Sequence, residues 1–342
     1  MAVTIKQIAE MSGISRGTVD RVLNNRGRVN PDKEALIRAI AVKMGYTPNL
    51  AGKALAARKK SLVIGVVLPS EGNPFFDDVI QGIRQAEKDL ADYGVRVVIR
   101  SLKGYDVKRH LAEIDVLAPK VNALILTPMD HPDFIQKINQ LMDSGKPVVT
   151  MNTDVKNSNR LCYVGSDYRK GGEIACGLLE LLTGGKANIA ILTGSGDILG
   201  HNQRIEGFLH VIEQRNLGFH IIGIAETRDD DETGFKATEA LLAEHPETNA
   251  AFIVAAGSFG VCKAISTFLA DKPILFPVVS FDLVAETREM MRQGIIKATI
   301  SQQPFVQGFE AVKTTFYYLV NRILPENREF IVKNEINILE SL

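Results

Sequence analysis

Residues 3–24 of this 342-residue chain read VTIKQIAEMSGISRGTVDRVLN. Two short amphipathic segments flank Gly13, which permits a sharp turn at positive φ. Thr4 and Gln7 have the spacing of a capping box, and Ser15 is placed to cap the second segment. Aliphatic residues recur at helical spacing on both sides of the turn. The pattern predicts two helices packed as a helix-turn-helix.

The second predicted helix carries polar residues suited to the major groove of DNA. The candidates for reading base edges, near its first turns, are Arg16, Gly17, Thr18 and Arg21. Arginine can bond guanine in bidentate fashion, and threonine offers a hydroxyl and a methyl group. Ser15 and Asn24, at the two ends, are placed for phosphates. Asp20 either accepts from a cytosine amine or orients a neighbouring arginine, and an ordinary exposed helix face is the alternative reading of the whole set.

Charge is unevenly distributed along the chain. Residues 1–60 hold twelve Lys and Arg against four Asp and Glu, a net of +8, although the whole chain has 40 of each. Residues 61–342 therefore carry a net of −8. A small basic module is the usual electrostatic footprint of phosphate binding, although a solvated, charge-rich helical face would give the same charge. Together with the helix-turn-helix pattern, the charge predicts a nucleic-acid-binding head on an acidic body.

The head resembles a known family over residues 3–60. The matching residues are Val3-Thr4-Ile5, Ile8-Ala9, Gly13, Ser15, Thr18-Val19, Arg21 to Asn24, Gly45-Tyr46 and Pro48-Asn49. They resemble the DNA-binding head and hinge of LacI-family transcription repressors, and Thr4 and Asn49 join the candidate DNA-binding residues. The resemblance implies a hinge helix over residues 50–57 that orders on the operator, with Leu55 as a wedge in the minor groove. A plain linker helix with Leu55 packed on the body is the alternative.

The body, residues 61–342, alternates buried-looking aliphatic runs with amphipathic stretches. The expected strands lie at 62–68, 95–99, 123–126, 147–151, 187–192, 219–224, 250–254, 275–280 and 297–300. This rhythm predicts an α/β body of doubly wound parallel sheets behind the small all-α head. The chain has no apolar stretch of twenty residues and no signal peptide, so a cytoplasmic protein without a membrane span is expected.

Polar and aromatic residues follow several of these strands. In doubly wound sheets the ligand crevice lies at the carboxyl ends of the strands. Aromatic faces ringed by Asp, Asn and Gln suit a sugar. The predicted wall residues are Ser70, Asn73, Asn152, Asp154, Asp282 and Gln302, with Phe75 and Phe76 to stack on the ligand.

Residues 62 to about 320 resemble the periplasmic sugar-binding-protein fold, in its ribose-binding branch. The resemblance is carried by Asn73-Pro74-Phe75-Phe76, Arg204 to Phe208, Ser280-Phe281-Asp282 and Ala298 to Gln302. It implies subdomains of residues 61–162 with 293–323 and 163–292 with 324–342, joined by three crossovers. The expected division is a head at 1–48, a hinge at 49–60 and an effector-binding and dimerisation domain at 61–342.

One departure from the family bears on the ligand's charge. Asn202 and Arg204 complete the candidate effector-binding residues. Asn202 stands where the family commonly has arginine, and Arg204, two residues on, is expected on another helix face, away from the crevice. If the Arg204 side chain turned into the crevice instead, a uronate or a phosphate would become a plausible ligand. With two carboxylates and no cation on the predicted wall, a neutral monosaccharide or polyol is favoured over a sugar acid or phosphate.

Enzymatic chemistry finds little support in the sequence. The cysteines and histidines lack metal-ligand or catalytic spacing, and the run Asp229 to Glu232 is expected to cap the helix that follows. No catalytic residue, metal or cofactor is predicted. We expect a regulator, a repressor that binds a palindromic operator as a homodimer under allosteric control by the sugar or polyol. The alternative is a sugar-binding sensor or sugar-processing protein whose basic head serves another role.

Overall fold

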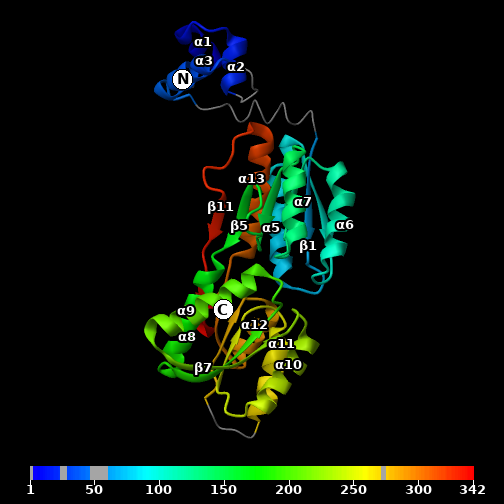
Figure 1. The fold of residues 1–342 in the computed structure, drawn as a ribbon, viewed down its shortest axis with the longest axis vertical. Coiled ribbons are helices and arrows are strands. Elements are labelled where there is room, and N and C mark those ends of the chain that lie inside the picture. The colour runs from blue at the N-terminus through cyan, green and yellow to red at the C-terminus, as the bar shows by residue number, and fades with distance from the viewer. Residues whose placement is uncertain (1–2, 24–28, 47–60, 271–274) are drawn as a thin grey trace.

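The structure is a computed structural model that describes residues 3–23, 29–46, 61–270 and 275–342. The head contains three helices among these residues, α1 (Ile5–Ser12), α2 (Arg16–Leu23) and α3 (Pro31–Lys43) (Figure 1). The predicted hinge helix, with Asn49 and Leu55, lies outside the described residues, as does Asn24.

The helix-turn-helix prediction is confirmed in its details. The Thr4 side chain accepts from the backbone N–H of Gln7, and the Gln7 side chain accepts from the Thr4 N–H, which completes the capping box. Gly13 ends α1 with φ 67°, in the left-handed region that glycine enters without a Cβ clash. The seam is closed by side chains that are fully buried in the head, namely Ile8, Val19 and Ile37.

Sheet A of the body has, within the described chain, six parallel strands in the order β11-β5-β4-β3-β1-β2. Their bounds are β1 (Leu62–Leu68), β2 (Val95–Ser101), β3 (Ala123–Leu126), β4 (Val148–Met151), β5 (Cys162–Ser166) and β11 (Glu329–Val332). One face packs against α5 (Phe75–Asp89) and α13 (Pro304–Asn321), and the other against α6 (Val107–Leu117) and α7 (Pro132–Asp143). Two 3-10 turns accompany it, η1 (Ala91–Tyr93) and η2 (Ala118–Lys120).

Sheet B repeats this arrangement, with the described strands in the order β12-β10-β9-β8-β6-β7 and only β12 antiparallel to its neighbour. The bounds are β6 (Lys186–Thr193), β7 (Gly218–Glu226), β8 (Ala250–Ile253), β9 (Val278–Phe281), β10 (Ile296–Ser301) and β12 (Glu335–Asn337). One face packs against α8 (Tyr168–Thr183) and α9 (Leu199–Arg215). The other packs against α10 (Asp231–Glu244), α11 (Ser258–Leu269) and α12 (Ala285–Arg292), and η3 (Leu339–Ser341) follows β12.

The nine predicted strands are all present. The inner strands are aliphatic runs that helices cover on both faces, whereas the edge strands β2 and β7 are partly exposed. Every residue of β3 and β8, for example, is buried. Three strands were not predicted. The edge strands β11 and β12 have mostly exposed side chains, and β5 contains a cysteine and a glycine that weaken its apolar pattern.

The chain crosses between the sheets later than the predicted boundaries at 162, 292 and 323. The strands that end beside the crossings are β5, β10 and β11, whose last residues are Ser166, Ser301 and Val332. β5 pairs with β4 in sheet A, and β10 pairs with β9 in sheet B. Each strand therefore forms its backbone hydrogen bonds within its own sheet before the chain crosses to the other sheet. The physical reason is that a strand that crossed earlier would leave its backbone groups without partners.

The helices α8 and α9 touch through their backbones. A Cβ atom at Gly172 would lie 1.9 Å from the carbonyl oxygen of Arg204, and one at Gly207 would lie 2.0 Å from that of Arg169. Only glycine fits at both points. This close approach fixes the position of α9 on sheet B.

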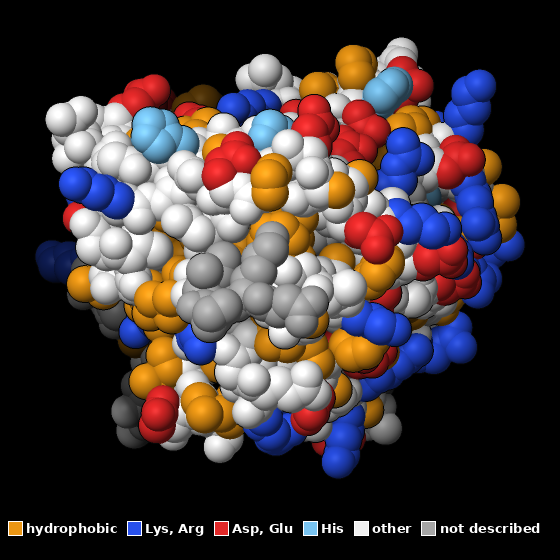
Figure 2. Space-filling model, turned by 90° about the horizontal axis from the view of Figure 1, so that it is seen from below, with side chains coloured by type: hydrophobic (Ala, Val, Ile, Leu, Met, Phe, Trp, Pro, Cys, Tyr) orange, Lys and Arg blue, Asp and Glu red, His pale blue; other side chains and the backbone are white. Residues whose placement is uncertain are grey.

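The surface of the sheet B subdomain is mixed in character. On the face seen in Figure 2, hydrophobic side chains are scattered among acidic and basic ones. Within the described ranges, no helix combines the length and the apolar character needed to cross a membrane.

Candidate functional site

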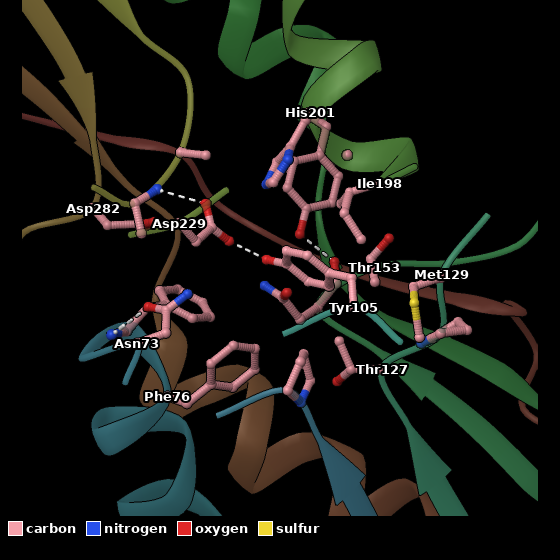
Figure 3. Close-up of a pocket in the computed structure, with 18 of the residues that line it drawn as sticks. Asn73, Phe76, Tyr105, Thr127, Met129, Thr153, Ile198, His201, Asp229 and Asp282 are labelled. Carbon is pink, nitrogen blue, oxygen red and sulfur yellow. Dashed lines mark hydrogen bonds between the residues drawn. The ribbon is translucent and has the colours of Figure 1, made fainter. Parts of the chain in front are cut away.

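A cavity lies between the two sheets, at the carboxyl ends of their strands (Figure 3). Its empty volume is about 560 Å³, which includes open solvent at its mouth. Sheet A contributes Asn73, Phe75, Phe76, Tyr105, Thr127, Met129, Asn152 and Thr153 among its lining residues. Sheet B and its helices contribute Tyr168, Ile198, His201, Arg204, Asp229, Ala256, Asp282 and Gln302.

Several strand-end residues around the cavity adopt left-handed backbone conformations. Asn152 and Asp282 both have φ 65°, and Asp229 has φ 55°. Asn and Asp enter this region more readily than other side chains, although at some cost. Such strain concentrates at ligand sites, where the surrounding structure holds it in place.

Arg204 lies in the cavity, and the expectation that it faces away is wrong. Its side chain is buried, and its guanidinium lies 3.7 Å from the ring centroid of Phe281 and 4.8 Å from that of Tyr168. It donates a hydrogen bond from Nη1 to the carbonyl oxygen of Val254. Arg204 and Asn202 do lie on different faces of α9, as expected, but the buried face of the helix is the one that carries Arg204.

Asn202 is exposed on the outer face of α9 and donates to the carbonyl oxygen of Gly196 over 2.7 Å. Two more predicted wall residues do not line the cavity, Ser70 and Asp154. The Asp154 carboxylate pairs with Arg160, which donates to it from Nη2 over 2.6 Å. Asp154 is therefore satisfied inside its own loop.

Asp282 and Gln302 both line the cavity and are hydrogen-bonded to each other. Gln302 donates from Nε2 to Asp282 Oδ1 over 2.9 Å and accepts from the Ser166 hydroxyl over 2.9 Å. Burial raises the pKa of the Asp282 carboxyl, while the charge of Arg204 and the Gln302 hydrogen bond oppose that rise. The hydrogen bonds from Ser166 to Gln302 and from Gln302 to Asp282 fix the orientation of the Gln302 amide. The Asp282 carboxyl also lies close to the cationic Arg204.

The sequence reasoning missed Tyr105, His201 and Asp229. Asp230 caps α10, as expected, by accepting from the Thr233 N–H over 2.9 Å. Asp229 instead turns into the cavity and accepts from the Ala256 N–H over 3.1 Å and from the Tyr105 hydroxyl. Its place in the loop three residues after β7 was a usable signal, because the rule that polar residues after strands face the crevice also identified Asp282 after β9.

His201 is buried beside the backbone of Ser195. Its Nδ1 accepts from the Ser195 N–H over 3.1 Å, and burial lowers its pKa. The hydroxyls of Thr127 and Thr153 and the Nε of Arg204 are buried and have no hydrogen-bond partner within the described part of the chain. These groups can bond a ligand without giving up a protein partner.

The head presents the predicted DNA-reading residues on α2. Arg16, Gly17 and Arg21 are exposed, and Ser15 caps the helix by accepting from the Thr18 N–H over 3.3 Å. Arg21 donates to the Gly17 carbonyl oxygen and to the Thr18 hydroxyl, both over 3.3 Å, so its side chain runs toward the start of the helix. Burial, and next the Asp20 carboxylate, raise the pKa of Tyr46, which places Asp20 on the Tyr46 side of α2.

Family comparisons agree with both halves of this architecture. Residues 4–49 match the model of the bacterial regulatory proteins of the lacI family, and residues 64–322 match that of the periplasmic binding protein domain. The chain belongs to the LacI family. It is a transcription regulator with a DNA-binding helix-turn-helix, and its family is not one of enzymes.

The similarity to named relatives covers most of this LacI-family protein. The ribose operon repressor of Bacillus subtilis (strain 168) is 24% identical over 329 residues, which cover 94% of each chain. The probable HTH-type transcriptional repressor ExuR of the same organism is 31% identical over 248 residues, 70% of this chain and 69% of ExuR. A glucose-galactose binding protein from Geobacillus stearothermophilus shares the body fold with a TM-score of 0.75 and 26% identity, over 82% of this chain and 99% of that one.

Proposed function

We propose that this LacI-family regulator is a cytoplasmic repressor that binds a palindromic operator as a homodimer. One helix-turn-helix reads a half-site, so a palindrome needs two copies of the chain. Base reading is assigned to Arg16 and Arg21, which are exposed on α2, and to Gly17 and Thr18 beside them. The proposed contacts to the DNA backbone come from Ser15, Thr4, Asn24 and Asn49. Leu55 remains the proposed minor-groove wedge of a hinge at 49–60.

The effector proposed for the 61–342 domain is a small neutral sugar or polyol. The carrying observation is the cavity between the sheets, where aromatic faces surround a few converging polar groups. Hydroxyl groups can donate to Asp229 and Asp282 and accept from Arg204, so such a ligand leaves few polar groups unpaired. The relatives named as ribose operon repressors support the same class of ligand.

Charge argues against an anionic effector. Arg204 brings one positive charge into the cavity, but Asp229 and Asp282 bring two carboxylates. Arg204 stacks on two aromatic rings and donates one of its N–H groups to a carbonyl oxygen, so it supplies a single positive charge against two carboxylates. A sugar acid or sugar phosphate would therefore meet net repulsion in a desolvated site.

A thermal-shift screen of sugars and polyols tests the proposal first, because a ligand that binds only the folded state raises the unfolding temperature. Calorimetry then compares each hit with its uronic acid and its phosphate. Tighter binding of the charged member, lost in Arg204→Ala, would refute the neutral class.

Operator control is tested by fluorescence anisotropy with labelled operator DNA, with and without the hit. The two affinities must be coupled by the same factor in both directions, on the order of 5- to 150-fold. An effector with equal affinity for the free and the operator-bound protein would refute allosteric control. Steep loss of operator binding with added salt separates DNA binding from a merely basic head.

A further inference from the structure

Tyr105 and Asp229 join the two subdomains directly across the cavity. Tyr105 stands between β2 and α6 on the sheet A side, and Asp229 follows β7 on the sheet B side. The Tyr105 hydroxyl donates to Asp229 Oδ2, while Oδ1 accepts from the Ala256 N–H over 3.1 Å (Figure 3). Each carboxylate oxygen therefore has its own donor, one from each subdomain.

The Tyr105–Asp229 contact lies far from the hinge, so a small rotation of the subdomains separates its two groups by a large distance. The three crossings between the subdomains follow β5, β10 and β11, whereas β2 and β7 are the opposite outer edges of the two sheets. Neighbouring strands lie about 4.8 Å apart, and four such steps separate β2 from β5 and β7 from β10, which places the contact roughly 19 Å from the hinge edge. A rotation of about 10° over that arm moves the two groups about 3 Å apart, enough to break a hydrogen bond.

Both partners are held in place before they meet. Asp229 and its neighbour Arg228 have φ 55° and 53°, and the Asp229 N–H donates to the Thr227 hydroxyl over 3.3 Å. On the other side, the loop before Tyr105 is tied to α6 by a 3.0 Å bond between Gly104 O and His110 Nε2. Burial, together with the Asp229 charge, raises the pKa of Tyr105 well above its usual range, so its hydroxyl keeps the donated proton.

We propose that Tyr105 and Asp229 form a latch that holds the effector cleft closed at its outer end and restricts the effector to ligands that fit between the latch and the hinge. The inference rests on the proposed function for its effect on the operator, but the closure itself is a property of the protein alone. Opening the cleft requires the latch to break, so the latch slows effector release and narrows the range of ligand sizes.

The other contacts across the cleft lie elsewhere. The Asp130 N–H donates to the Asp197 carbonyl oxygen over 3.0 Å, after β3 and β6, which are inner strands. Ile198 packs into the sheet A core beside Met129. These two contacts involve the main chain and an aliphatic side chain. Nearer the hinge, after β4, the Asn152 carbonyl oxygen accepts a hydrogen bond from the Tyr168 hydroxyl of α8. The Tyr105–Asp229 bond is thus a contact at the outer edge that one conservative substitution removes.

The decisive experiment measures closure without any ligand. Spin labels on cysteines introduced at the exposed positions Lys108 on α6 and Glu239 on α10 report the distance across the outer edge by pulsed electron paramagnetic resonance. Cys162, Cys176 and Cys262 are buried, so labelling is confined to the introduced sites. Tyr105→Phe removes the hydroxyl and keeps the ring, and Tyr93→Phe is the matched control, because Tyr93 stacks on Phe316 far from the cleft.

We expect Tyr105→Phe to shift the ratio of closed to open molecules by roughly tenfold to a hundredfold, as for a hydrogen bond to a charged group. A longer distance should appear in this variant and not in Tyr93→Phe. Asp229→Ala should give the same change, with no further effect in the double variant. Identical distance distributions in wild type and Tyr105→Phe overturn the latch. If Asp229→Ala fails to fold by circular dichroism, the Tyr105→Phe result decides alone.

A second arm uses D-ribose as the probe in stopped-flow binding. If ribose binds, Tyr105→Phe should raise its dissociation rate about tenfold or more and leave its association rate nearly unchanged. An unchanged dissociation rate contradicts the latch. If ribose and the other screened sugars do not bind at all, the proposed effector class fails, while the distance measurement still decides the latch.

Discussion

Replacing Gly172 on α8 by alanine should destabilise the protein, against the usual effect of this change within a helix. The new methyl carbon would lie 1.9 Å from the carbonyl oxygen of Arg204 on α9, and that oxygen belongs to rigid backbone. Ordinary contact needs about twice that distance, so the two helices must move apart. Overpacking of this kind costs about 1–3 kcal/mol. The gain in helix propensity returns only about 0.5–1 kcal/mol, so a net loss of stability is expected.

Gly177 provides the control within the same helix. A Cβ atom there meets no other atom within 4 Å, so Gly177→Ala should stabilise the protein by about 0.5–1 kcal/mol. The chain contains no tryptophan, so urea unfolding is followed by far-ultraviolet circular dichroism. The two substitutions should move the urea midpoint in opposite directions.

The displacement should also reach the cavity, because the residue pushed away is Arg204 itself. Effector affinity should therefore fall in Gly172→Ala and stay unchanged in Gly177→Ala. If Gly172→Ala proves as stable as Gly177→Ala, the helices are not in the backbone contact described, and the reasoning is refuted.

Three further predictions follow from the head and the cavity. Arg16→Ala should weaken operator binding by about 1–3 kcal/mol and relax preference at one base position, as measured by anisotropy on operators with single base changes. Folding lowers the pKa of His201, so the unfolded chain binds a proton more readily than the folded one and the protein loses stability as the pH falls below about 6.5. The unfolding temperature of His201→Gln should therefore fall less than that of the wild type between neutral and mildly acidic pH. Light scattering at micromolar concentration with operator DNA should give two chains per DNA, and a persistent monomer would contradict the dimer.

Much of the fold could be predicted because its signals are local. Caps, turns and aliphatic runs act within a few residues, and they located the helices of the head and the central strands of the body. The crossings between subdomains were misplaced because they depend on which strand completes a ladder with which neighbour. That pairing joins residues far apart in the chain, such as those of β5 and β11.

The cavity residues were also predicted where the signal is local and missed where it depends on distant parts of the chain. Asn152 and Asp282 directly follow strands, and Asn73 lies in the loop after β1, so a rule about the ends of strands found all three. Arg204 was misjudged because the spacing of two helical residues says that their faces differ but not which face is buried. Tyr105 was missed because its role depends on the outer edges of two sheets meeting across the cleft, which no short segment encodes.

The three crossings have a consequence for how the protein is made on the ribosome. Strands β1 to β5 emerge first, but sheet A still lacks its edge strand β11 and the helix α13 that covers one face. Both belong to residues 304–332, which are synthesised only after all of β6 to β10. The nascent chain must therefore carry an uncovered apolar surface on sheet A while the other subdomain forms. Burial of Ala311, Val312 and Phe316 against that surface is a late event, and until it occurs the uncovered face of sheet A is open to chaperones and to aggregation.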